Sequence, residues 1–167
     1  AAPTRADIDR QALAAVAALR RRLLLITGGP GTGKTTTVAR LLAIQVADAG
    51  ARGRAPLRIA LAAPTGRAAA RLGEAIDSVV RADLDAGRLD AANAEAIPRQ
   101  ARTLHRLLGW QPGRVAFRHD ADRPLPFDLV VVDEASMVDL PLMAKLVAAV
   151  PADATLVLLG DPDQLPA

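Results

Sequence analysis

A glycine-rich segment near the start of the chain has the residue types that bind phosphate. Residues 28–35 read Gly-Gly-Pro-Gly-Thr-Gly-Lys-Thr, which fits the pattern GxxxxGK[ST]. Glycines let the backbone curl so that successive N–H groups face one anion, and the N-terminus of a following helix suits phosphate. Lys34 would add a full charge for β and γ phosphates, and Thr35 would offer its hydroxyl to Mg²⁺. A turn that binds no ligand is the alternative interpretation.

Two adjacent carboxylates follow an apolar run later in the chain. Residues 129–132 read Leu-Val-Val-Val, and Asp133 and Glu134 come next. A phosphate loop that hydrolyses a nucleoside triphosphate needs an acidic partner for its metal at the end of another strand. Asp133 would hold Mg²⁺, and Glu134 would orient and deprotonate the attacking water. Alternatively, the two carboxylates cap the next helix.

A third polar segment, residues 160–164, also follows an apolar run. Gln164 would sense a γ-phosphate or position water, because an amide both donates and accepts hydrogen bonds. Taken alone, this segment is an ordinary turn with Asp and Pro.

The strands that would position these residues are short, continuous apolar runs of the kind that is buried on both faces of a sheet. We expect them at 23–26, 57–62, 129–132 and 155–159. Strands that alternate with helices predict an α/β fold, with a parallel sheet and helices on both faces. Ligands of such a sheet gather at the carboxyl ends of its strands, where all three polar segments fall.

Helical spacing of apolar residues predicts the elements between these strands. We expect helices over 9–20, 34–49, about 67–84 and 140–149, with a helical turn at 103–108. Residues 85–101 have weak patterning and are either helical or loose. Glycine, proline and mixed charges at 109–126 indicate an excursion, with a hairpin as one possible form.

The composition restricts the class of protein. The chain has 167 residues, of which 51% are hydrophobic and 23% charged, as in one globular domain. It has no cysteine and two histidines, which excludes disulfides and thiolate chemistry and disfavours a transition-metal site. No apolar run approaches the roughly 18 residues of a membrane span. Without a secretory segment at its start, we expect a cytoplasmic protein, and because the chain lacks an initial Met, a piece of a longer one.

The charge is distributed unevenly along the chain. Residues 51–123 carry thirteen Lys or Arg against eight Asp or Glu, whereas residues 124–167 carry one against seven. This asymmetry suggests a polyanion at one region and carboxylates around a cation at another. A solvated surface in an arginine-biased sequence is the alternative.

Five segments occur in an order that resembles a known family. They are GGPGTGKTTT at 28–37, APTGRAAARL at 63–72, TLHRLLG at 103–109, VDEASM at 132–137 and GDPDQLP at 160–166. Together they resemble the first motor domain of superfamily 1 DNA helicases of the RecD type, a family that includes alpha subunits of exodeoxyribonuclease V. The resemblance implies a single RecA-like P-loop NTPase domain over residues 1–167, the ATP-binding half of a helicase core.

The resemblance also assigns individual residues to ATP. It implies that Gln11 reads the adenine edge, although a surface glutamine on a helix is the alternative. It implies a catalytic set of Lys34, Asp133, Glu134 and Gln164, with Mg²⁺ held by Thr35 and Asp133. The implied phosphate-binding residues are Gly28, Gly29, Pro30, Gly31, Thr32, Gly33, Lys34, Thr35 and Thr36.

Two further segments resemble those with which this family contacts single-stranded DNA. The first contains Pro64, Thr65, Gly66 and Arg67, where a strand end, a helix N-terminus and an arginine suit a phosphate backbone. The second contains Thr103 and His105. A structural role for His105 is equally open, since a lone histidine serves many purposes.

For the longer protein, the resemblance implies ATP-driven 5′ to 3′ movement on single-stranded DNA and unwinding in double-strand-break repair and recombination, with RecB and RecC subunits as partners. A stand-alone RecD-like helicase is the main alternative, followed by a non-catalytic P-loop binding module and a P-loop kinase. The second motor domain of the family, with its arginine finger, has no counterpart in these residues. We therefore expect this chain alone to bind Mg-ATP weakly, to hydrolyse it very slowly and not to translocate.

Overall fold

The computed structural model describes residues 22–29, 31–113, 116–161 and 164. Within them, one parallel sheet has the strand order β1-β5-β4-β2-β3. The strands are β1 (Leu23–Thr27), β2 (Ile59–Ala63), β3 (Ala101–Thr103), β4 (Leu129–Val132) and β5 (Thr155–Gly160). Because every neighbouring pair is parallel, the carboxyl ends of all these strands meet at one edge of the sheet.

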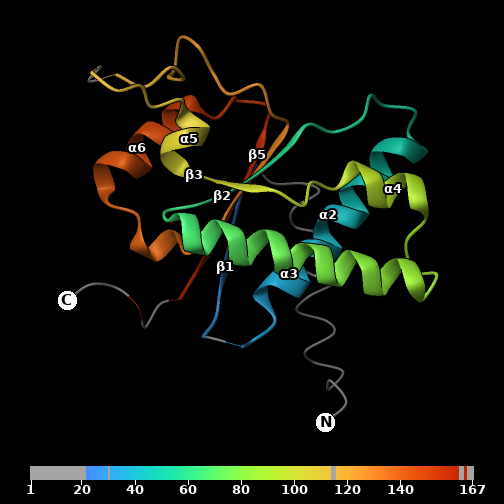
Figure 1. Ribbon diagram of the computed structural model, residues 1–167. Coiled ribbons are helices and arrows are strands. Elements are labelled where there is room, and N and C mark those ends of the chain that lie inside the picture. Colours follow the sequence, from blue (N-terminus) through green and yellow to red (C-terminus); the bar gives the residue numbers. More distant parts are fainter. Residues whose placement is uncertain (1–21, 30, 114–115, 162–163, 165–167) are drawn as a thin grey trace.

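Helices cover both faces of this sheet, which confirms the predicted α/β architecture (Figure 1). On one face lie α2 (Lys34–Ala51), α3 (Gly66–Asp85) and α4 (Ala91–Ala96). On the other lie α5 (Leu104–Leu108) and α6 (Leu140–Ala149), and a 3-10 turn, η1 (Ala135–Met137), follows β4.

The alternation of side chains along β4 explains why both faces need a helical cover. Leu129 and Val131 pack with the apolar sides of α2 and α3, whereas Val130 and Val132 pack with α5 and α6. All of these side chains are at most 2% exposed. A strand buried on both faces reads as a solid apolar run, and this property made β4 easy to predict.

The predicted bounds agree best with the structure for β4, α6 and β5. The expected strand 129–132 matches β4, the expected helix 140–149 matches α6, and β5 extends by one residue, to Gly160. The strand expected at 57–62 instead begins at Ile59, because the backbone N–H of Arg58 donates to the Asp128 carboxylate at 2.8 Å.

The weakly patterned part of the chain, expected to be either helical or loose, contains a short helix and a short strand, and of these the strand was not predicted. The first is α4, which Asp90 caps by accepting a hydrogen bond from the N–H of Asn93 at 2.8 Å. The second is β3, an edge strand with the sequence Ala-Arg-Thr, too short and too polar to give a strand signal. The possible hairpin at 109–126 is not observed, because the described residues of that stretch contain no strand. The helix expected at 9–20 lies outside the described residues.

Helix α3 has a fixed position against the sheet because of a close contact at Gly73. A β-carbon built on Gly73 would lie 2.4 Å from the carbonyl oxygen of Arg99, just before β3. Leu72 and Ile76 are buried in the core beside it. Within the described ranges, no helix is long and apolar enough to cross a membrane.

Candidate functional site

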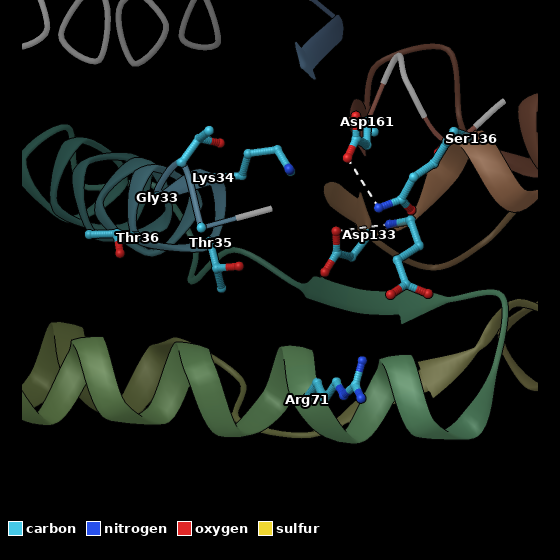
Figure 2. A pocket seen from close by; sticks show the side chains of 13 residues that line it. Gly33, Lys34, Thr35, Thr36, Arg71, Asp133, Ser136 and Asp161 are labelled. Carbon is cyan, nitrogen blue, oxygen red and sulfur yellow. Dashed lines mark hydrogen bonds between the residues drawn. The ribbon is translucent and has the colours of Figure 1, made fainter. Parts of the chain in front are cut away.

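A pocket of about 490 Å³ lies at the carboxyl ends of β1, β4 and β5. We call it the strand-end pocket. Figure 2 shows its lining side chains, which come from the start of α2, from α3 and from the segments after β4 and β5. The lining residues are Gly31, Thr32, Gly33, Lys34, Thr35, Thr36, Arg71, Asp133, Glu134, Ser136, Gly160, Asp161 and Gln164.

The glycine-rich loop forms the wall between β1 and α2, and its curl depends on glycine. Gly31 and Gly33 have φ values of 74° and 81°, in the left-handed region that side chains disfavour. A β-carbon on Gly28 would lie 2.7 Å from the hydroxyl oxygen of Thr32. The N–H of Gly28 also donates to the carbonyl of Gly160 at 3.2 Å, which ties the loop to the end of β5.

Lys34, at the first position of α2, folds over this loop. Its ammonium donates to the carbonyl oxygens of Gly28 and Gly29, with the Gly29 contact at 2.8 Å. The neighbouring side chains of Thr35 and Thr36 also line the pocket. The loop therefore brings together an ammonium, two hydroxyls and the N-terminus of an 18-residue helix, a set of groups that favours phosphate.

Asp133 and Glu134 lie across the pocket, directly after β4. The Asp133 N–H donates to the carbonyl of Ala62 at 2.9 Å, and its carboxylate accepts from the N–H of Glu134 at 2.8 Å. Glu134 makes no side-chain cap to η1, and Asp139 caps α6 by accepting from the N–H of Leu142. The alternative in which Asp133 and Glu134 cap the following helix is therefore wrong.

The backbone of Glu134 is itself unusual. Its φ of 52° lies in the left-handed region, and it is the one non-glycine residue among those described for which this holds. Such a conformation costs of order 1–3 kcal/mol and persists where the surroundings impose it. Residues of this kind cluster at functional sites, in agreement with the position of Glu134 in the pocket lining.

The segment after β5 closes the pocket on its third side. The Gln164 side chain donates to the Asp161 carboxylate at 3.1 Å, and the Gln164 N–H donates to the Asp161 carbonyl at 3.2 Å. Asp161 is buried, with 6% of its surface exposed. The three polar segments selected from the sequence thus meet at one place, as parallel strand ends require.

Four lining residues were not selected individually from the sequence: Gly160 and Asp161, which precede Gln164, and Arg71 and Ser136. Arg71 reaches the pocket from α3, and the hydroxyl oxygen of Ser136 is buried without a hydrogen-bond partner within the described residues. Both lie inside segments that had been noted, APTGRAAARL and VDEASM. The signal that could have indicated Arg71 is helical spacing, because it lies one turn after Arg67.

The segments that resemble DNA contacts lie together, but outside the strand-end pocket. Strands β2 and β3 are neighbours, with Ala63 opposite Thr103. Thr65 follows β2 and caps α3 by accepting from the N–H of Ala68 at 3.2 Å. Thr103 ends β3 and caps α5 by accepting from the N–H of Arg106 at 3.3 Å. We call Thr65 and Thr103 the capping threonines.

The surroundings of the capping threonines are open and basic. Thr65, Gly66 and Arg67 are exposed and Pro64 is half-buried. His105 is also exposed, and its ring centroid lies 5.8 Å from that of Phe117. Of the residues that the sequence assigned to the nucleotide, Gln11 and Pro30 lie outside the part of the chain that the structure describes.

Known proteins are similar to this chain in sequence and in architecture. Residues 11–167 match the family AAA_19, described as an AAA domain. The chain is 51% identical over 162 residues to the RecBCD enzyme subunit RecD of Mycolicibacterium smegmatis. It is 44% identical over 146 residues to the ATP-dependent RecD2 DNA helicase of Deinococcus radiodurans. These alignments cover 96% and 87% of this chain but only 28% and 16% of the two relatives.

A solved structure of Bacteroides Pif1 bound to single-stranded DNA has a similar fold. The TM-score is 0.52 at 22% sequence identity, and the alignment covers 95% of this chain and 32% of that one. At this identity the likeness concerns the fold, and it supports the predicted RecA-like α/β class.

Proposed function

This chain belongs to the AAA_19 family of AAA domains, and from that premise we propose that it is the ATP-binding motor domain of a 5′ to 3′ DNA helicase of the RecD type. The observation that carries the proposal is the strand-end pocket, in which the ammonium of Lys34 and the carboxylates of Asp133 and Glu134 lie on facing walls. In the longer protein, ATP hydrolysis would drive translocation on single-stranded DNA and unwinding.

The donor groups of the pocket suit Mg-ATP. Thr35 and Asp133 offer one hydroxyl and one carboxylate in the same lining. The described residues contain no group of three or more His, Cys, Asp or Glu that could hold a metal ion alone. Mg²⁺ usually takes one or two protein groups and completes its shell with phosphates and water. Bound there, Mg²⁺ would neutralise charge on the phosphates.

The residues that we assign to the nucleotide then have distinct roles. The N–H groups of residues 31–36 would surround the phosphates, and the Lys34 ammonium would exchange its two loop carbonyls for β and γ oxygens. Glu134 would orient and deprotonate the attacking water, and the Gln164 amide would position it. Gln11 would read the adenine edge.

The capping threonines are our proposed contacts for the DNA backbone. Each hydroxyl oxygen accepts a helix N–H, so each O–H proton stays available to a phosphate oxygen. Pro64, Gly66 and Arg67 lie beside Thr65, and His105 lies beside Thr103. Contacts of this kind position a nucleic acid without reading its sequence.

The names of the relatives support a proposal for the partners of the longer protein. Identity of 51% to a RecBCD subunit favours a parent that works with RecB and RecC subunits in the cytoplasm, in double-strand-break repair and recombination. A stand-alone helicase like RecD2 is the second candidate, with 44% identity. In either case we expect residues 1–167 by themselves to bind Mg-ATP weakly, to hydrolyse it very slowly and not to translocate.

The dependence of nucleotide binding on Mg²⁺ tests this proposal. A fluorescent ATP analogue is titrated into the 167-residue chain with Mg²⁺ and with EDTA. We expect Mg²⁺ to tighten binding to the wild type but to have little effect on Asp133→Asn. Asp153→Asn is the matched control, because Asp153 is exposed in the turn before β5, at the opposite end of that strand. A wild type that binds no nucleotide would contradict the proposal.

A further inference from the structure

One wall of the strand-end pocket belongs to α3, which carries none of the residues assigned to ATP. Figure 2 shows the Arg71 side chain extending from this helix toward the side of the pocket on which Asp133 lies. The pocket lining contains two cationic side chains, Lys34 and Arg71, and they come from different helices. Arg71 therefore faces the same space as Lys34 from another side.

The N–H groups of the Arg71 guanidinium are available to bind a ligand. Within the described part of the chain it makes no hydrogen bond and no ion pair, although Asp133 and Glu134 line the same pocket. Arg81, farther along α3, is by contrast paired with Asp77 at 2.8 Å. If Arg71 served only to neutralise the two carboxylates, a direct ion pair would be expected.

Helix α3 holds Arg71 in a defined place. The Thr65 cap fixes the start of the helix, and the contact between Gly73 and the Arg99 carbonyl fixes its middle. Leu72, the next residue, is 1% exposed. A side chain on such a helix presents its charge more reproducibly than one on a loop.

We propose that Arg71 binds the terminal phosphate of the nucleotide. This inference rests on the proposed function, because it requires ATP in the strand-end pocket. Lys34 and the loop would hold the phosphates from the side of α2, which leaves the terminal phosphate to face Glu134, after β4, and Arg71, on α3. Guanidinium matches phosphate oxygens with paired N–H groups, a geometry that an ammonium lacks.

The difference between ATP and ADP tests the inference. Competition against a fluorescent nucleotide gives the Kd of Mg-ATP and of Mg-ADP for the wild type, Arg71→Ala and Arg71→Lys. We expect Arg71→Ala to raise the Kd of Mg-ATP about tenfold, the effect of losing a charge-assisted hydrogen bond. The Kd of Mg-ADP should rise less than twofold. Arg71→Lys keeps the charge without the paired donors, and its Kd for Mg-ATP should lie between those of the wild type and Arg71→Ala.

Arg40→Ala is the matched control, since Arg40 is exposed on α2 and does not line the pocket. It should leave both affinities unchanged, and thermal unfolding shows whether each variant keeps its fold. The inference is overturned if Arg71→Ala binds ATP as tightly as the wild type does, or if its affinities for ATP and ADP fall by the same factor. Neither of these outcomes contradicts the proposed function. A wild type that binds neither nucleotide would contradict both the inference on Arg71 and the proposed function.

Discussion

The carboxyl edge of the sheet presents two regions that differ in shape and charge. At the ends of β1, β4 and β5 it is hollowed into the strand-end pocket, which contains the carboxylates of Asp133, Glu134 and Asp161. At the ends of β2 and β3 it is an open surface, with the capping threonines and the exposed arginines Arg67 and Arg106.

The difference arises from the loops that follow the strands. A left-handed glycine loop leaves β1, and a left-handed Glu134 follows β4, so the chain curls around a space. The segments after β2 and β3 instead turn directly into helices through threonine caps. One edge of a parallel sheet can thus carry a concave region and an exposed one, to which we have assigned the nucleotide and the DNA as proposals.

The replacement Lys34→Gln should show the largest difference between the two regions, because it should weaken nucleotide binding and leave DNA binding almost unchanged. We expect it to raise the Kd for Mg-ATP about 100-fold or more, because the charge nearest the β and γ phosphates is lost. Binding of a labelled oligo-dT, measured by fluorescence anisotropy, should change less than twofold. In the longer protein, the proposed ATPase and unwinding activities should be abolished. Wild-type ATP affinity in this variant would contradict the role of the loop, and an equal loss of DNA binding would contradict the separation.

A larger residue at Gly73 should damage both regions together. Gly73→Ala places a β-carbon against the Arg99 carbonyl, and we expect the free energy of unfolding to fall by about 1–3 kcal/mol. Since α3 carries both Arg67 and Arg71, ATP and DNA affinities should weaken in parallel. Urea unfolding measures the first effect. The control is Gly50→Ala in α2, where a β-carbon meets nothing within 4 Å and stability should be unchanged or slightly higher.

The replacement Arg67→Ala should affect only the open region. We expect oligo-dT binding to weaken about three- to tenfold, and the slope of log K against log salt to fall by about one, as for the loss of one phosphate contact. ATP affinity should stay within twofold of the wild type. Arg81→Ala, at the far end of α3 and paired with Asp77, is the matched control. Equal DNA binding by the two variants would place the DNA elsewhere.

The smallest effect is expected at the opposite edge of the sheet. Asp128 precedes β4 and accepts hydrogen bonds from the backbone and the guanidinium of Arg58, at 2.8 Å each. The guanidinium hydrogen bond lowers the pKa of Asp128 below its ordinary value. A lowered pKa stabilises the fold above the unfolded-state pKa of about 3.9, and this stabilisation is lost as the pH falls through the folded-state pKa.

We therefore expect Asp128→Asn to lower the Tm by about 1–3 °C at pH 7, with both ligand affinities intact. The difference in Tm from the wild type should shrink as the pH falls below about 4, because the carboxyl of the unfolded chain takes up a proton there before the folded-state carboxyl does. Differential scanning calorimetry from pH 3 to pH 7 measures this. A difference in Tm that stays constant over that range would rule out the electrostatic explanation.

The part of the fold that the sequence predicted well is governed by local patterns. Continuous apolar runs gave the extent of β4, and a glycine pattern followed by helical spacing gave the start of α2. The missed elements depend on long-range contacts. Strand β3 exists because β2 offers it a parallel partner, and its own three residues carry almost no strand signal.

The candidate site divides in the same way. The residues selected from the sequence lie in the segments that follow strands or at the start of the next helix, and the parallel topology brings these segments to one edge. Arg71 lies inside a helix, and whether it faces the pocket or solvent depends on how α3 is rotated against the sheet. That rotation is set by the packing of Gly73 on Arg99, a contact between residues far apart in the sequence.

The left-handed backbone of Glu134 has a consequence for selection experiments on this domain. Glycine is the residue that this conformation would accept at the lowest conformational cost, yet the position holds a carboxylate. A library screened for thermal stability should therefore enrich glycine at position 134, whereas one screened for nucleotide hydrolysis should reject it. The conflict between the two screens would mark this single position as one where the demands of folding and of turnover point to different amino acids.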